Sequence, residues 1–345
     1  MREARGQHVE DYGTLVAQTL AWAVDDARRY LSDSELARLT PTGRVEADRR
    51  LLDTLLTLRE PGTVPSQAAD AIGALLDAEA RDRGVVDVAT LPRVASSGPL
   101  SAMALWQGDI TRLRVGAVVN AANSALLGCR VPGHACIDNA IHAAAGPWLR
   151  NACAEHVRAQ GAPEPTGTAV LTPGFSLPAQ AVIHTVGPVV SGGEPTEENA
   201  RLLASCYRSC LETAWSAGLD SIALCSVSTG AFGYPVEQAA RVALTEVLDW
   251  LGEHGDSAGA AEASGPAVGA VRACSSSSTP SPSVTLRCTR AFWRSTRAAS
   301  GVVLPGTQVP AASRRVAAPV TPRARHHSHG LAAEATKSSR AAESS

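Results

Sequence analysis

Residues 117–124 read Ala-Val-Val-Asn-Ala-Ala-Asn-Ser, and residues 221–235 read Ser-Ile-Ala-Leu-Cys-Ser-Val-Ser-Thr-Gly-Ala-Phe-Gly-Tyr-Pro. In both, a short apolar run ends in a polar or glycine-rich loop. Similar β-rich runs alternate with stretches of helical spacing from about residue 101 to 252. This alternation predicts an α/β domain with a largely parallel, buried sheet. Ligands of such domains bind beyond the carboxyl ends of the strands, so these two loops are candidates for a site.

The chain before this domain has a helical pattern. Residues 14–31, 42–59 and 66–84 place apolar side chains at helical spacing, and Pro61-Gly62 ends the second stretch. No combination of residues there indicates chemistry. We therefore predict a helical region over 1–95, with a packing role, and the α/β domain over 96–252.

Charge divides the 345-residue chain unevenly. Residues 1–256 hold 20 Arg, no Lys and 30 acidic residues, whereas residues 257–345 hold 11 basic and 3 acidic residues. The segment 253–345 is rich in Ser, Pro, Ala and Arg, which predicts a disordered, basic, low-complexity tail. Its basic residues are sparse and have few aromatic neighbours, so a nucleic-acid partner is not favoured.

The chain also lacks the features of a membrane protein. No segment approaches the roughly 18 apolar residues that span a bilayer, and the first 13 residues contain no apolar signal core. We expect a cytoplasmic protein without a membrane partner.

Two of the polar loops follow strands. Gly108-Asp109-Ile110-Thr111 contains an acid that is a turn former or, alternatively, an acceptor for an exocyclic amine such as adenine N6. Residues 119–123 contain two Asn residues three apart, which serve either as turn residues or as ligands for a ribose.

A dense group of metal ligands follows in residues 129–136. Cys129, His134 and Cys136 form a Cys-x4-His-x-Cys pattern at the start of a predicted helix. Thiolates and imidazole are typical zinc ligands, and three protein ligands with an open fourth position are typical of catalytic sites. A fourth ligand from elsewhere would instead make the site structural.

The loop 226–235 follows a strand and precedes a helix that Pro235 opens. Its glycines allow backbone N–H groups to approach a phosphate, and no Lys follows, so it is not a P-loop. Phe232 and Tyr234 flank the glycines, and aromatic faces stack on sugars and bases.

Together these loops resemble the macrodomain family, whose modules bind ADP-ribose. The matching segments are 108–111, 119–123, 138–146, 182–188 and 228–235. The Cys-x4-His-x-Cys insert, with Trp106-Gln107 and residues 87–92, is similar to the zinc-dependent microbial branch of protein ADP-ribosylhydrolases. The resemblance covers about residues 14–252. It implies a three-layer α/β/α sandwich with a mixed central sheet, preceded by the helical region and followed by the tail.

The resemblance also implies roles for individual residues. Asp109 holds the adenine amine beside the Ile110 backbone, and Asn123 orients the distal ribose. Zinc is held near the scissile linkage by Cys129, His134 and Cys136. Asp138 acts either as a base or as a residue that fixes the metal loop. The diphosphate and distal ribose are wrapped by Ser228, Thr229, Gly230, Ala231, Phe232 and Gly233.

The implied activity is removal of mono-ADP-ribose from Asp or Glu side chains of a modified protein, with Asn123 and Asp138 as catalytic residues. The alternative is a reader that binds ADP-ribose without cleaving it. After residue 252 the family has one more apolar strand, and here the sequence turns to Ala, Ser, Pro and Arg. We therefore expect the sheet to lack a strand, as the product of a frameshift in the coding sequence would.

Overall fold

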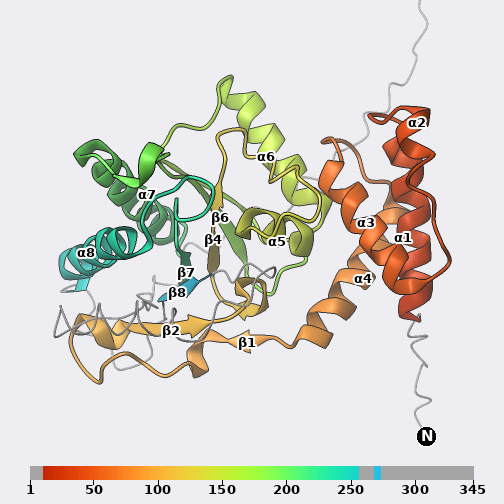
Figure 1. Ribbon diagram of the computed structural model, residues 1–345. Helices are drawn as coiled ribbons and strands as arrows, with labels where there is room; N and C mark the ends of the chain where they lie inside the picture. Colours follow the sequence, from red (N-terminus) through yellow and green to blue (C-terminus); the bar gives the residue numbers. More distant parts are fainter. Residues whose placement is uncertain (1–10, 256–267, 273–345) are drawn as a thin grey trace, which may run out of the picture. The chain divides into compact units, whose positions relative to one another are not determined.

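The computed structural model of the chain describes residues 11–255 and 268–272. Its first four helices are α1 (Tyr12–Ala27), α2 (Asp33–Leu36), α3 (Val45–Leu58) and α4 (Ser66–Arg83) (Figure 1). The long helices α1, α3 and α4 share an apolar core that contains the buried Leu20, Leu52, Leu55 and Leu75. The three predicted helices are confirmed, and α2 is an additional turn closed by a capping box between Ser32 and Glu35.

The second part of the fold is a six-stranded sheet of order β2-β8-β7-β4-β6-β5. All neighbours in it pair in parallel except β5 and β6, which are antiparallel. This confirms the predicted α/β fold with a mixed sheet. The strands are β2 (Met103–Gln107), β4 (Ala117–Ala122), β5 (Ala169–Pro173), β6 (Ala181–Val186), β7 (Ile222–Cys225) and β8 (Val268–Arg272).

Helices flank this sheet. In Figure 1, α5 (Ile137–Ala145) and α6 (Pro147–Gln160) lie on one side of the β4–β6 pair, and α7 (Glu197–Ser216) and α8 (Val236–Gly255) lie on the other. Every residue of β6 and β7 is buried, because helices cover both faces of the central strands. The carboxyl ends of β4 and β7 carry the two loops on which the predicted site depends.

Strand β8 corrects an expectation. The sheet was expected to lack a strand after residue 252, yet Val268–Arg272 pairs in parallel with both β2 and β7. The pairing is made by main-chain hydrogen bonds, which any short extended segment can form. Residues 268–272 contain two β-branched valines, which favour a strand, although the surrounding sequence is rich in Ser and Ala. Residues 256–267 and 273–345 of the predicted tail lie outside the described residues, and the frameshift stays a prediction.

A short strand pair adjoins the expected domain boundary at residues 95–96. β1 (Val86–Asp87), in the segment assigned to the helical region, pairs in parallel with β3 (Leu113–Arg114). The guanidinium of Arg112 also donates to the Gly84 carbonyl at 2.8 Å. The linker after α4 is therefore bound to the segment that precedes β4.

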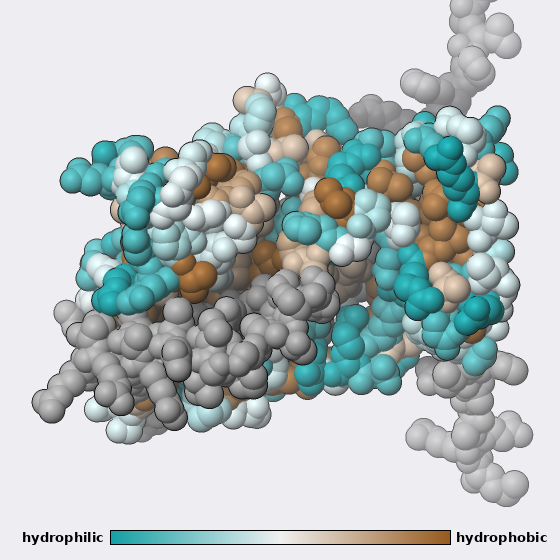
Figure 2. Space-filling model, in the orientation of Figure 1, coloured by the Kyte–Doolittle hydropathy of each residue, from teal (hydrophilic) through white to brown (hydrophobic). Residues whose placement is uncertain are grey.

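The surface of the described residues carries scattered apolar side chains. On the face drawn in Figure 2, apolar residues are interspersed with polar ones, and exposed apolar side chains such as Val131 and Val189 are unremarkable when scattered. In the part of the chain that the structure describes, no helix is long and apolar enough to cross a membrane.

Two glycines test the backbone packing. A Cβ on Gly73, inside α4, would meet no heavy atom within 4 Å, whereas a Cβ on Gly116 would lie 2.5 Å from the Ser221 carbonyl oxygen. We expect Gly73→Ala to raise the free energy of unfolding by about 0.5–1 kcal/mol, because Ala has less freedom in the unfolded chain. Gly116→Ala should lower it by about 1–3 kcal/mol. Urea unfolding checks both, and a stable Gly116→Ala protein would contradict the crowded backbone before β4.

Candidate functional site

The site begins at the end of β4, where Asn120 is completely buried. Its amide Nδ2 donates to Asp138 Oδ1 at 2.8 Å and lies 3.2 Å from His184 Nδ1. One amide nitrogen has two protons, so it serves both acceptors. Asn120 therefore joins β4 to α5 and β6 through its side chain. The next Asn along the chain, Asn123, is only partly buried.

His184 is neutral in this arrangement. Since its Nδ1 accepts from Asn120, its proton is on Nε2, which lies 3.0 Å from the Thr172 hydroxyl. Burial lowers the pKa of His184 to about 3. His142, Cys153 and His184 have ligand atoms within 4.8 Å of one another. The proton on Nε2 leaves His184 no lone pair for a metal on that side, so this buried group belongs to the core.

Asp138 lies in the first turn of α5 and is 5% exposed. Besides the bond from Asn120, its Oδ2 lies 3.5 Å from the amide nitrogen of Asn123. Burial raises the pKa of Asp138 to about 6, while the Asn120 hydrogen bond and Arg150 act in the opposite direction. Asn123 also donates to the Gly128 carbonyl at 3.1 Å, which connects Asp138 to the loop that follows.

That loop brings the three expected metal ligands together. The ligand atoms of Cys129, His134 and Cys136 all lie within 4.8 Å of one another, and Cys129 Sγ is 3.2 Å from His134 Nδ1. The side chain of Asn139 closes the loop by donating to two of its carbonyls, at 3.2 and 3.0 Å. The backbone of the loop is therefore held by a side chain of α5.

The donor set fits zinc. Ligand atoms of a tetrahedral Zn²⁺, at about 2.0–2.3 Å from the ion, lie roughly 3.3–3.8 Å from one another. Two thiols and an imidazole within 4.8 Å need only small rotations to reach that spacing. Burial, together with the neighbouring Cys129, raises the pKa of Cys136 to about 12. The thiolate of Cys136 therefore needs a bound cation beside it to form at neutral pH.

Asp109 lies at the far end of the same sheet edge and is exposed. One carboxylate oxygen accepts from the backbone and hydroxyl of Thr111, at 2.9 and 2.7 Å, which caps a short 3-10 helix. The other oxygen makes no hydrogen bond to a described residue. Ile110, the next residue, is buried.

The loop after β7 presents backbone donors. The N–H groups of residues 229–232 make no hydrogen bond within the described part of the chain, while the bonds from Gly233 and Tyr234 back to Gly230 and Ser228 hold the turn. Ser228 has a positive φ of 64° and a buried hydroxyl without a hydrogen-bond partner. Successive free N–H groups before the N-terminus of α8 form an anion cradle.

Sequence comparison relates the chain to known proteins. A sequence profile described as Macro domain matches residues 119–243. A protein-ADP-ribose hydrolase from Treponema medium is 44% identical over 200 residues, which are 58% of this chain and 76% of that protein. The chain belongs to the Macro domain family. A protein-ADP-ribose hydrolase from Staphylococcus aureus (strain MRSA252) is 48% identical over 149 residues, 43% of this chain and 56% of that protein.

Macrodomains of known structure are also similar. The Trypanosoma brucei macrodomain in complex with ADP-ribose is 36% identical and has a TM-score of 0.46, over 64% of this chain and 89% of that chain.

Most of the residues expected from the sequence gather at one edge of the macro domain sheet. Asn123, Asp138 and the metal loop are in direct contact or adjacent, and Asp109 and the 228–233 loop follow other strands of the same sheet. Tyr234 differs from its expected place: it is 2% exposed and packs in the core, so only the half-buried Phe232 remains beside the loop. The N–H of Tyr234 donates to the Ser228 carbonyl, so the turn folds Tyr234 back on the residues that follow β7.

The macro domain site also uses residues that the sequence did not indicate. Asn120 was one of two equivalent Asn residues, and the buried Arg150 of α6 was not singled out. The 3.0 Å contact of His184 with Thr172 depends on the pairing of β5 with β6. From the sequence, only the alternation of buried and accessible positions along β4 and the loop after it could have indicated that Asn120 points inward and Asn123 does not.

Because His184 is neutral in the fold, acid should lower the free energy of unfolding. Its folded pKa of about 3 lies below the unfolded value of about 6.5, so the unfolded chain binds more protons between these values. The contribution of His184 to stability is complete above pH 6.5 and falls by about 1.4 kcal/mol per pH unit below it.

Urea unfolding of the wild type and His184→Gln from pH 7 to 5, with chelator present, measures this contribution. The difference in unfolding free energy between the two proteins should shrink by about 2 kcal/mol over that range. A constant difference would mean that His184 is charged or solvated in the fold.

Proposed function

We propose that this macro domain is a zinc-dependent protein-ADP-ribose hydrolase that removes mono-ADP-ribose from Asp or Glu side chains. The relatives named protein-ADP-ribose hydrolase support hydrolysis of an ADP-ribosyl linkage. The observation that carries the proposal is the convergence of Cys129, His134 and Cys136 next to the Asn123–Asp138 pair. Zinc, the acidic linkage and a cytoplasmic location are parts of this proposal.

Binding of ADP-ribose follows the sheet edge. The unbonded oxygen of Asp109 accepts from the adenine amine, and the N–H groups of residues 229–232 take the diphosphate. Phe232 lies against the distal ribose, as aromatic rings do on sugars. The distal ribose then lies between the anion cradle and the metal loop, where the amide of Asn123 orients it.

The reaction breaks the bond between the distal ribose and the side-chain carboxylate. One water is consumed, its OH completes one fragment and its proton the other, so that ADP-ribose and a free carboxyl group are released. When bound by Cys129, His134 and Cys136, zinc supplies Lewis acidity at this linkage. The chain itself contributes orientation, which lowers the entropic part of the barrier.

Asp138 has two conceivable roles, and its contacts favour positioning. Both of its oxygens face the amides of Asn120 and Asn123, and the carboxyl group is buried. A carboxylate held this way fixes the Asn123 amide nitrogen between Asp138 and the Gly128 carbonyl, and it leaves Oδ1, which accepts from the Ala125 N–H, as the atom that accepts from a ribose hydroxyl. It would act as a base only if Asn123 moved aside.

Removal of one metal ligand tests the zinc role. We expect Cys136→Ala and His134→Ala to lose stoichiometric zinc and to release ADP-ribose from an Asp/Glu-modified protein at least about 100-fold more slowly. Binding of free ADP-ribose should stay within a few-fold of wild type, because its adenine and diphosphate contacts lie elsewhere. Zinc content, single-turnover release and calorimetric titration are the measurements.

His254→Gln, on α8, is the matched histidine control and should behave as wild type. Full hydrolysis by a zinc-free variant would contradict the role of the metal. Tight ADP-ribose binding by zinc-loaded wild-type protein without any release would instead identify a reader.

The anion cradle has its own test. A Cβ on Gly187 would lie 2.0 Å from the Ser228 hydroxyl and 2.6 Å from a Val227 methyl. We therefore expect Gly187→Ala to displace the loop and to weaken ADP-ribose binding about tenfold, the equivalent of about 1.4 kcal/mol. Zinc content should not change. Gly252→Ala, where a Cβ meets nothing within 4 Å, is the control, and equal affinity in both variants would exclude this loop from binding.

A further inference from the structure

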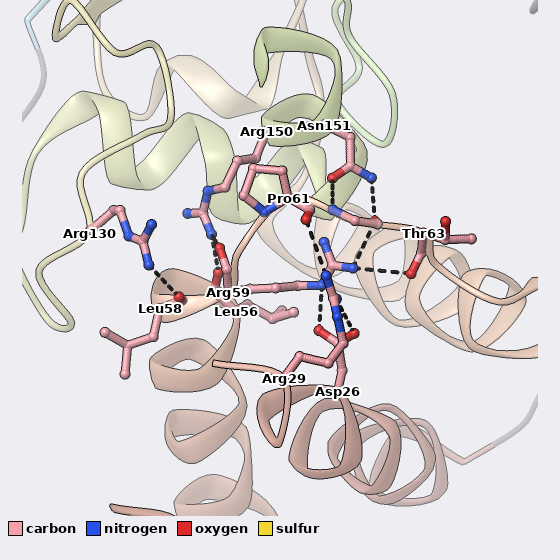
Figure 3. Close-up of polar contacts among 11 residues, drawn as sticks. Asp26, Arg29, Leu56, Leu58, Arg59, Pro61, Thr63, Arg130, Arg150 and Asn151 are labelled. Atoms are coloured by element: carbon pink, nitrogen blue, oxygen red, sulfur yellow. Dashed lines mark hydrogen bonds and ion pairs between the residues drawn. The ribbon is translucent and has the colours of Figure 1, made fainter. Parts of the chain in front are cut away.

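Arg150, in the first turn of α6, joins the helical region to the metal loop. It is 5% exposed, and its guanidinium donates to the carbonyls of Leu56 and Arg59 at 2.8 and 2.6 Å (Figure 3). Its Nε donates to the Leu127 carbonyl at 2.8 Å, two residues before Cys129. One buried cation thus holds the end of α3 and the start of the metal loop in a single contact.

Arg130 makes the second connection from the residue after Cys129. Its guanidinium donates to the Leu58 carbonyl at 2.9 Å and forms an ion pair with Glu60 at 2.6 Å. Cys129 therefore lies between Leu127, which is joined to residues 56–59 through Arg150, and Arg130, which binds Leu58 and Glu60 directly.

The C-terminal end of α3 needs such partners. The last carbonyls of a helix have no intrahelical N–H partner and favour cations. α3 has no basic residue in its own last turn. Arg130 and Arg150 supply the missing cations, and hydrogen bonds from a charged donor are stronger than neutral ones.

The segment that receives these bonds is itself held firmly. Asn151 donates to the Gly62 carbonyl at 2.8 Å and accepts from the Gly62 N–H at 2.9 Å. Arg59 is 2% exposed, pairs with Asp26 of α1 at 2.9 Å and lies over the ring of Trp22. Residues 56–62 are therefore fixed from both the helical region and α6.

We propose that the end of α3 is a clamp for the metal loop, with Arg130 and Arg150 as positioning residues for the zinc ligands. The helical region is then a working part of the site and sets how tightly Cys129 is held for the metal. This rests on the proposed function for its consequence in catalysis, but the clamp itself is a property of the metal-free protein.

Arg130→Ala in the full chain tests the clamp directly. We expect Cys129 of the zinc-free variant to be alkylated by iodoacetamide several-fold faster than in wild type, because the loop opens more often. The zinc dissociation constant should rise about tenfold, as is typical when a residue behind a metal ligand is lost. Peptide-resolved mass spectrometry measures the first quantity, and competition with a chromogenic chelator measures the second.

Two further variants complete the design. Arg150→Lys keeps the buried charge but cannot reach three carbonyls, and it should show the same two effects. Arg201→Ala removes an exposed arginine that pairs with Glu198 on α7, and it should show neither. Free ADP-ribose affinity should stay unchanged in all three, which reports that each variant is folded.

The outcomes separate the two proposals. Alkylation and zinc affinity within twofold of wild type in both clamp variants would overturn the clamp. Faster alkylation in both, with no release of ADP-ribose by zinc-loaded wild type, would support the clamp and contradict hydrolysis. If wild type binds no zinc, the alkylation rates alone decide.

Discussion

One buried amide holds the centre of the site in place. Asn120 places a single nitrogen between Asp138 and His184, so that β4, β6 and α5 meet through two hydrogen bonds. A carboxylate at this position would repel Asp138, and an apolar residue would remove the amide donor from Asp138 Oδ1 and from the buried His184 Nδ1, which is costly. Because Asn120 must donate in both directions, His184 is neutral and Asp138 turns its second oxygen toward Asn123.

The loop that follows depends on this arrangement. Asn123 faces Asp138 on one side and the Gly128 carbonyl on the other, so the polar pair beneath the site also bounds the metal loop. Gly128 has a positive φ of 78°, and a Cβ there would lie 3.0 Å from the His142 ring. The loop therefore packs directly on α5 before it turns outward to His134. Two thiols then lie close together in a partly buried place, where a bound cation would favour their thiolate forms.

The helical region takes part in the same structure. The cluster between α1, α3 and α4 is its own, but Trp148 of α6 packs against Ala68, Ile72 and Leu76 of α4. The polar end of α3 is shared too, since its carbonyls are satisfied by arginines of the macro domain. A guanidinium that bridges three carbonyls is difficult to replace, because each carbonyl would lose a charged donor, and the bond to Arg59 is fully buried. The helical region, which has no chemical motif of its own, is thereby joined to the loop that contains Cys129.

The sequence by itself determined the three long N-terminal helices, most of the α/β domain, the loops after β4 and β7, and the grouping of Cys129, His134 and Cys136 in one loop, because hydrophobic period, turn residues and residue spacing are local properties. It could not determine which Asn faces inward, that Tyr234 is buried, or that Arg150 reaches α3, because these depend on tertiary contacts. The bond from Asn120 to His184 joins residues 64 apart, and the bond from Arg150 to Leu56 joins residues 94 apart. Strand β8 was also decided by tertiary contacts, here main-chain hydrogen bonds to β2 and β7. Its residues carry little local signal, and only the two neighbouring strands, which offer unpaired backbone groups on either side, decide that it is a strand.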